Sequence, residues 1–242
     1  IDRDTLEPRF RVIGCDLWSD DPDFPEKVDG IGVTGICGSG VIEAIAEMFL
    51  AGIISPDGVI DGDLATVNPR VAKDGRTYSY TLFHAENEIL ISQTDVRQIQ
   101  LAKAALYAGV KLLMDKMGVK ATEKIRLAGA FGSHISTVHA MVIGLLPDCE
   151  LDNVSSAGNA AGTGARIALL SGESRKEIEE VVRRIEKIET AVESNFQSYF
   201  VDAMAFPNGK DSFSKIFEVV TPPEPKGTSS VTRPRRSRRS VR

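Results

Sequence analysis

Three short segments rich in Gly, Ser and Thr constrain this sequence most. They cover residues 35–40, 129–133 and 158–164, and each lies beside a predicted helix. Glycine lets a backbone approach a ligand closely and adopt positive φ, and a helix N-terminus presents N–H groups with a partial positive charge. Together these properties predict phosphate-binding loops. Tight turns and close helix packing need the same residues, so a purely structural role stays open.

Hydrophobic periodicity predicts an α/β chain around these segments. Helical patterns cover 41–50, 94–117, 138–146, the residues from 164 to 170, and 173–194, and strand patterns cover 10–15, 78–83, 89–91, 125–128 and 216–220. Asp74-Gly75 predicts a hairpin. We expect one domain over 1–220 with an α/β insertion around 55–92, followed by a disordered basic tail over 221–242.

Charge is distributed unevenly along the chain. Seven of the 29 basic residues lie in 226–242, which has no acidic residue, so residues 1–225 carry 22 basic and 34 acidic side chains and a net charge of −12. An acidic body of this kind argues against a nucleic-acid-binding domain. No apolar run approaches the ~20 residues that span a bilayer. We therefore expect a cytoplasmic protein without a membrane or nucleic-acid partner.

The sequence contains no convincing match to the common nucleotide-binding and metal-binding motifs. Residues 30–35 fit the G-x-G-x-x-G pattern, but no buried strand precedes them and the helix begins only after Gly40, so a Rossmann site is a weak alternative. The P-loop pattern does not occur. Cys15, Cys37 and Cys149 lack the paired spacings of zinc or iron–sulfur sites. We predict no metal site.

Polar residues on two predicted helices could either contact a ligand or simply face solvent. Lys103 lies on a polar stripe of the 94–117 helix, where it could neutralise phosphate charge, or the stripe could simply be a solvated face. Glu43 and Glu47 are four residues apart and could bind Mg²⁺ or face solvent. His134 and His139 do not form a metal motif, and we expect loop or packing roles for them.

Five motifs in a fixed order resemble one family. They are the runs 35–46 (GICGSGVIEAIA), 91–105 (ISQTDVRQIQLAKAA), 127–132 (LAGAFG), 143–147 (IGLLP) and 157–166 (AGNAAGTGAR). Together, over about residues 28–220, the chain resembles the C-terminal domain of the reductive activators of corrinoid proteins. That domain belongs to the actin/sugar-kinase/Hsp70 (ASKHA) superfamily, in which a mixed sheet is flanked by helices.

The resemblance implies an ATP-dependent activator that returns Co(II) corrinoid to Co(I) in a corrinoid-dependent methyltransferase system. Its implied cofactors are ATP with Mg²⁺ and a [2Fe–2S] cluster in a ferredoxin-like domain upstream of Ile1. Its implied partner is the corrinoid protein of that system, and homodimerisation stays open. This chain has no C-x₄-C-x₂-C spacing and no Asp-Gly-Thr/Ser-Thr phosphate loop, so the fragment alone is expected to bind nucleotide weakly or not at all.

By motif order, the resemblance implies that residues 129–132 lie against the nucleoside, 158–164 near the domain hinge, and 35–40 near the cleft or the partner surface, whereas no residue can be given a catalytic role. The candidate cofactor-binding residues are Gly38, Ser39, Gly40, Lys103, Gly129, Ala130, Phe131, Gly132, Gly158, Asn159, Gly162, Thr163 and Gly164. Two other functions remain open: another ASKHA ATPase or small-molecule kinase, and a non-enzymatic partner-binding domain. A kinase needs a base on the substrate hydroxyl, and no residue stands out for that role.

Overall fold

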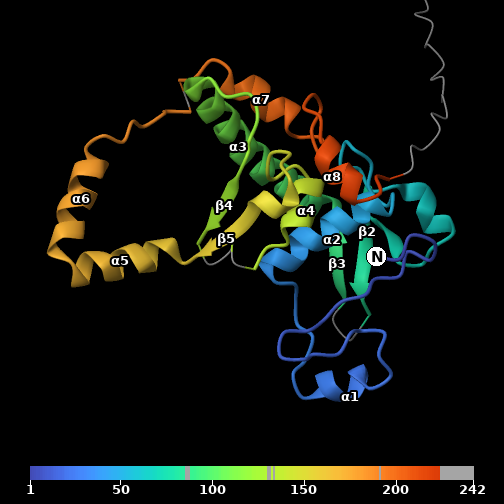
Figure 1. The fold of residues 1–242 in the computed structure, drawn as a ribbon. Helices are drawn as coiled ribbons and strands as arrows, with labels where there is room; N and C mark the ends of the chain where they lie inside the picture. Colours follow the sequence, from blue (N-terminus) through green and yellow to red (C-terminus); the bar gives the residue numbers. More distant parts are fainter. Residues whose placement is uncertain (85–87, 130–131, 133, 191, 224–242) are drawn as a thin grey trace, which may run out of the picture.

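The computed structural model describes residues 1–84, 88–129, 132, 134–190 and 192–223. Figure 1 shows a body made by most of these residues and an arm that projects from it. The helices of the body are α1 (Phe24–Asp29), α2 (Gly38–Leu50), α3 (Gln93–Met117), α4 (Thr137–Val142), α7 (Phe196–Asp202) and α8 (Ser214–Val219), with short 3₁₀ helices at Gly62–Thr66 and Leu151–Asn153. The arm consists of α5 (Ala160–Leu170) and α6 (Gly172–Val182).

The strands form two small sheets. They are β1 (Val71–Asp74), β2 (Thr77–Phe83), β3 (Ile89–Ser92), β4 (Ile125–Ala128) and β5 (Val154–Gly158). β1, β2 and β3 are antiparallel, in that order, and the predicted turn at Gly75 joins the first two with a φ of 58°. β4 and β5 are parallel, with Ile125 opposite Val154. The α/β class is confirmed, and its antiparallel and parallel strands lie in separate sheets.

Local signals set both ends of α3. The Ser92 hydroxyl accepts a hydrogen bond from the N–H of Asp95, and the Asp95 carboxylate accepts one from the N–H of Ser92, which is a capping box. Gly118 ends the helix with a φ of 66°, a left-handed conformation that glycine adopts at little cost. The helix predicted over 94–117 is therefore confirmed to within one residue at its start, and Ser92 is its cap.

The buried face of α3 includes the polar stripe of Lys103 as well as apolar residues such as Val96 and Leu112. Gln100, Lys103 and Tyr107 are 2%, 0% and 4% exposed, whereas Leu113 and Met117 are 53% and 74% exposed. The reading of this stripe as a solvated face is wrong. The reason is tertiary: backbone carbonyls near the C-terminal end of the body accept hydrogen bonds from Gln100 and Lys103, and the Asp211 carboxylate accepts one from the Tyr107 hydroxyl.

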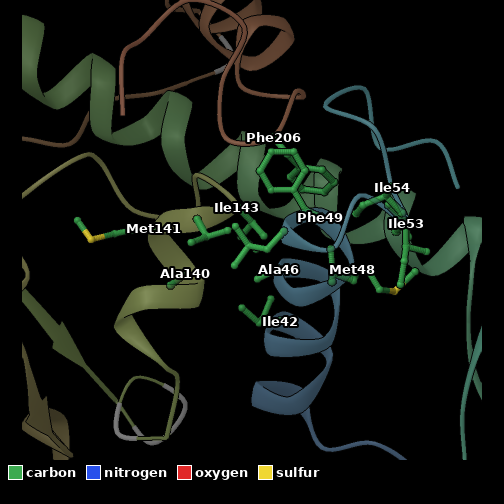
Figure 2. Packing of buried hydrophobic residues seen from close by; sticks show 14 of the residues in the cluster. Ile42, Ala46, Met48, Phe49, Ile53, Ile54, Ala140, Met141, Ile143 and Phe206 are labelled. Carbon is green, nitrogen blue, oxygen red and sulfur yellow. The ribbon is translucent and has the colours of Figure 1, made fainter. Parts of the chain in front are cut away.

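The core lies between α2 and α4. Figure 2 shows Ile42, Ala46 and Phe49 of α2 facing Ala140 of α4 and Ile143 just after it. Phe206 covers Phe49, with their ring centroids 5.9 Å apart. This packing holds α2 by its buried side, so the opposite side of the helix and its N-terminus remain available to line a cavity.

Two predicted strands are wrong. Residues 10–15 form no strand, because Gly14 turns the backbone at a φ of 91° and Cys15 donates a hydrogen bond back to Val12. The segment predicted as a last strand forms α8 instead. The carboxylate of Asp148 accepts hydrogen bonds from the N–H groups of Lys215 and Ile216, and this cap stabilises the first turn of that helix.

Two predicted helices are shorter than expected. α4 ends at Val142 rather than at 146, and α6 ends at Val182 rather than at 194. The apolar side chains of α6 are exposed, among them Ile178 at 40% and Val182 at 59%. Residues 224–242 of the predicted tail lie outside the described residues.

Candidate functional site

A cavity of about 840 Å³ opens at the N-terminal end of α2. One wall is the irregular segment 8–13 with Trp18, and the floor is the exposed side of α2 from Ser39 to Glu47. The end of β2 and the start of β3 close it on another side, through Phe83 and Ile89. The volume lies in the range of sites for small molecules and cofactors.

Cys37 stands at the rim of this cavity as the N-cap of α2. Its Sγ lies 3.4 Å from the Ser39 hydroxyl and accepts a hydrogen bond from the N–H of Gly40 at 3.4 Å. These two hydrogen bonds, the one to Ser39 first, hold the pKa of the thiol below its ordinary value. The arrangement fixes the Gly38-Ser39-Gly40 turn, with Ser39 and Gly40 in the cavity lining.

A hydrogen-bonded chain lies deeper in the cavity. His139 joins Glu47 and Ser136, with its Nε2 3.0 Å from Glu47 Oε1 and its Nδ1 2.7 Å from Ser136 Oγ. Burial favours the neutral form of Glu47, but the hydrogen bond from His139 opposes it and the pKa of the carboxyl is lowered below its ordinary value. Glu47 is therefore an ionised group at neutral pH, and half of the predicted acidic pair is already engaged.

Side chains of both charge signs line the cavity. Arg9 and Arg11 lie over the Trp18 ring, at 4.4 and 4.2 Å from its centroid, and Arg9 also pairs with Asp20. Glu43 of α2 is half-buried in the floor and makes no ion pair within the described residues. The walls suit a ligand with an anionic part and an apolar or aromatic part.

The second and third glycine segments meet at the carboxyl ends of β4 and β5. The Gly129 N–H donates a hydrogen bond to the Gly158 carbonyl, at 2.8 Å, and both glycines have positive φ. Asn159 caps α5 by accepting a hydrogen bond from the N–H of Gly162. The carboxyl edge of parallel strands is where open α/β sheets bind ligands, so these two segments form one candidate region.

Lys103 does not face a cavity. Its ammonium is fully buried and donates to the carbonyl oxygens of Ala203, Ala205 and Pro207, at 2.6, 2.5 and 2.8 Å. The Phe206 ring lies under it, 5.2 Å away. Burial lowers the pKa of Lys103 to about 7, and the three carbonyls oppose that shift because they favour the charged form. All three donors are used, so the expected phosphate contact at this residue is wrong.

The predicted site residues thus lie in different places. Ser39 and Gly40 line the cavity next to Gly38, Gly129, Gly132 and the 158–164 segment lie at the β4–β5 edge, and Lys103 is buried away from both. Ala130 and Phe131 lie outside the described residues. Sequence reasoning missed the chain from Ser136 to Glu47, because its members are 89 or more positions from Glu47 along the chain. The spacing of Glu43 and Glu47 was the one signal pointing there.

No group of three or more His, Cys, Asp or Glu side chains comes together as a metal site in the described part of the chain. Cys15 and Cys149 are buried and Cys37 is exposed, and none of the three pairs with another. A [2Fe–2S] cluster requires four ligands, so these three thiols do not fit one. Among the described ranges, no helix has both the length and the apolar composition to cross a membrane.

Comparisons with known proteins agree with this picture. Residues 1–217 match the family model described as the C-terminal domain of RACo, the ASKHA domain. Corrinoid activation enzyme RamQ from Eubacterium limosum is 40% identical over 183 residues, which are 70% of this chain and 31% of RamQ. A solved structure, the reductive activator for corrinoid, iron-sulfur protein, is similar with a TM-score of 0.65 and 32% identity. That likeness covers 72% of this chain and 28% of the other.

The chain spans less than a third of the length of either relative. The family model, by contrast, matches nearly all of the described residues. The ordered glycine motifs, the α/β fold and this match lead to one conclusion. The chain belongs to the family of RACo C-terminal ASKHA domains.

Proposed function

We propose that this chain is the nucleotide-responsive domain of an activator that returns Co(II) corrinoid to Co(I) for a corrinoid-dependent methyltransferase. The observation that carries the proposal is the match of residues 1–217 to the ASKHA domain of RACo. Both relatives are named as activators of corrinoid systems. A domain of this kind acts by binding nucleotide more tightly in one conformation, because a ligand shifts an equilibrium only by its differential affinity.

The geometry supports nucleotide contacts at two places. The N-terminus of α2, with Gly38, Ser39 and Gly40, offers backbone N–H groups and a positive dipole end to phosphate. The joined turns at Gly129 and Gly158 leave their Cα positions open, because a Cβ built on either meets nothing within 4 Å. We assign the phosphates of Mg-ATP to the first place and the nucleoside to the second.

The [2Fe–2S] cluster belongs outside residues 1–242 in this proposal. When bound, such a cluster supplies the single electron that Co(II) accepts, and this chain offers too few free thiols to hold it. The role left to these residues is to bind nucleotide and to bias the conformation in which the corrinoid protein receives the electron. The corrinoid protein is therefore the proposed partner.

A negative charge introduced at the N-terminus of α2 tests whether phosphate binds there. Ser39 occupies the second position of α2, where a carboxylate stabilises the helix through its dipole. We expect Ser39→Glu to weaken Mg-ATP binding at least about 10-fold, since a carboxylate repels phosphate at this distance, while the unfolding temperature is unchanged or higher. Calorimetric titration with Mg-ATP and thermal unfolding measure the two effects in the polypeptide as its gene encodes it.

Thr94→Glu is the matched control. Thr94 occupies the same second position in α3, is exposed, and lies outside the lining of the large cavity. The control should leave Mg-ATP affinity within a factor of about 2, because charge effects of helix ends fall off within one turn. Equal loss of affinity in both variants would contradict the assignment of phosphate to α2.

The activity itself is tested with a corrinoid protein held as Co(II). Visible absorbance should show conversion to Co(I) when the gene-encoded polypeptide, a low-potential reductant and Mg-ATP are all present, and no conversion without ATP. Conversion at the same rate without nucleotide would contradict the proposal. Transfer of the ATP γ-phosphate to a small molecule would instead identify a kinase of the same superfamily.

A further inference from the structure

The short helix α4 is tied to the turn at the end of β4. Ser136 caps the helix by accepting a hydrogen bond from the N–H of His139, at 3.4 Å. Seven positions separate Ser136 from Gly129, the residue that joins the two turns of the β4–β5 edge. Gly132 packs closely on β4, because a Cβ there would lie 3.1 Å from the Leu127 side chain. The position of α4 therefore depends on the edge where we place the nucleoside.

The ring of His139 reaches from α4 to the floor of the large cavity. Its Nε2 lies 3.0 Å from Glu47 Oε1, and its Nδ1 lies 2.7 Å from Ser136 Oγ. An ionised carboxylate only accepts hydrogen bonds, so Nε2 carries a proton and donates it toward Glu47. The other oxygen of Glu47 accepts a hydrogen bond from the Ile1 nitrogen, at 2.7 Å. His139 and Glu47 both line the cavity, so their contact connects the β4–β5 edge to its floor.

This hydrogen bond gives the packing of α4 on α2 a direction. Figure 2 shows that the two helices otherwise meet through apolar side chains, with Ile42 and Ala46 facing Ala140. Apolar contacts are non-directional, so they hold the helices together without fixing a shift of one along the other. Within the described residues, the His139–Glu47 contact is the one hydrogen bond between α2 and α4. A shift at Glu47 is carried by the rigid helix to its N-terminus, roughly 13 Å away.

We propose that His139 is a positioning residue that, through Glu47, holds the two nucleotide contacts in register so that one Mg-ATP reaches both. The inference rests on the proposed function, since it needs phosphate at the N-terminus of α2 and nucleoside at the β4–β5 edge. A ligand with two contacts gains affinity from the second only when the geometry allows both at once. Without the hydrogen bond α2 can shift, and the two contacts are no longer made together.

Removal and repair of the hydrogen bond test the proposal in the polypeptide as its gene encodes it. His139→Leu should weaken Mg-ATP binding at least about 5-fold, the lower end of coupling between two sites. His139→Gln should keep the affinity within a factor of about 2 of the wild type, because its amide nitrogen can donate to Glu47 in place of the ring. Calorimetric titration is carried out at a temperature at which circular dichroism shows each variant to be folded.

His84→Leu is the matched control. It removes another histidine–glutamate contact of the same length, since His84 Nδ1 lies 3.0 Å from Glu88 Oε1, and both residues are exposed and lie outside the lining of the large cavity. This control should change Mg-ATP affinity by less than about 2-fold, because exposed pairs contribute little.

Adenosine separates register from damage to a single contact. It has no phosphates and meets only the β4–β5 edge, so its affinity should agree within about 2-fold between the wild type and His139→Leu. NMR titration measures this weaker binding. An equal loss of affinity for adenosine and for Mg-ATP would place the effect in the nucleoside contact and overturn the proposal.

Unchanged Mg-ATP affinity in a folded His139→Leu would also overturn it, because apolar packing alone would then position α2. If His139→Leu does not fold, Glu47→Ala removes the same hydrogen bond from the side of α2, and full affinity in that variant contradicts the proposal equally. A wild type that does not bind Mg-ATP would contradict the proposed function itself, and this inference with it.

Discussion

The long helix of the body buries polar side chains, whereas the first helix of the arm exposes apolar ones. α3 buries Gln100, Lys103 and Tyr107, all of which are polar, while α5 exposes Leu169 and Leu170. In α3 the polar groups find acceptors in the 203–211 segment, whereas in the arm the two leucines stay largely exposed. Burial here follows the availability of a partner rather than the polarity of the residue.

Among substitutions that test this difference between α3 and the arm, we expect the largest loss of stability at Lys103. Lys103→Met keeps the length of the side chain but leaves three buried carbonyl oxygens without their donor. We expect the free energy of unfolding to fall by about 4 kcal/mol, in the range for breaking buried charged interactions. Urea unfolding followed by circular dichroism measures the loss.

Lys111→Met is the control for this substitution. Lys111 lies two turns further along α3, where its ammonium is 3.1 Å from an Asp211 carboxylate oxygen and its side chain is 24% exposed. A pair of that kind contributes about 1 kcal/mol or less. Similar losses of unfolding free energy in Lys103→Met and Lys111→Met would contradict the view that the three buried carbonyls make Lys103 more important for stability.

Gly144 provides a second, somewhat smaller effect in the body. It has a φ of 70°, and a Cβ there would overlap the carbonyl oxygen of Pro207. Gly144→Ala should therefore cost about 3 kcal/mol of unfolding free energy through strain and displacement of that loop. Gly109→Ala in α3, where a Cβ meets nothing within 4 Å, should instead be neutral or gain up to about 1 kcal/mol.

Glu47 provides an effect on the order of 1 kcal/mol that depends on pH. Against the effect of burial, the hydrogen bond from His139 lowers the pKa of this carboxyl in the folded protein below the ordinary 4.5. The contribution is thus fully present above pH 4.5 and is lost as the pH falls toward 2. Glu47→Gln should be less stable than the wild type at pH 6 and equally stable near pH 2, in urea unfolding at both values. A pH-independent difference, or an equal one in Glu43→Gln, would contradict this origin.

The smallest effect is expected in the arm. Val182 of α6 is 59% exposed, so Val182→Ser in the 242-residue chain should change the unfolding free energy by less than about 0.5 kcal/mol. Val142 of α4 is fully buried, and the same substitution there should cost about 2 kcal/mol or more. A loss of unfolding free energy in Val182→Ser as large as in Val142→Ser would contradict the view that arm side chains contribute little to the stability of this chain.

The fold features that the sequence predicts correctly are those set by neighbours in the chain. Ser92, Asp95 and Gly118 define α3 from residues within or beside it, and Gly75 does the same for the hairpin. The features predicted wrongly depend on distant residues. The cap of α8 comes from Asp148, 67 positions before the residue whose N–H it accepts, and no local pattern contains that information.

The candidate site shows the same limit. The Gly38-Ser39-Gly40 turn could be found because glycine at a helix start is a local signal. The assignment of Lys103 to phosphate failed because a lysine in a polar stripe looks the same whether it meets a ligand or three carbonyls. The contact of His139 with Glu47 spans 92 positions and depends on how α4 packs on α2.

The three hydrogen bonds of Lys103 also affect the order in which parts of the domain can fold during translation. Lys103 is synthesised about a hundred residues before Ala203, Ala205 and Pro207. Its ammonium therefore has none of these three acceptors until translation of the 242 residues is nearly complete. Until then the helix can dock only with that cation still hydrated. The body of this domain therefore closes late, after the arm has already been made, and a chain truncated before residue 203 has no means of burying the inner face of its longest helix.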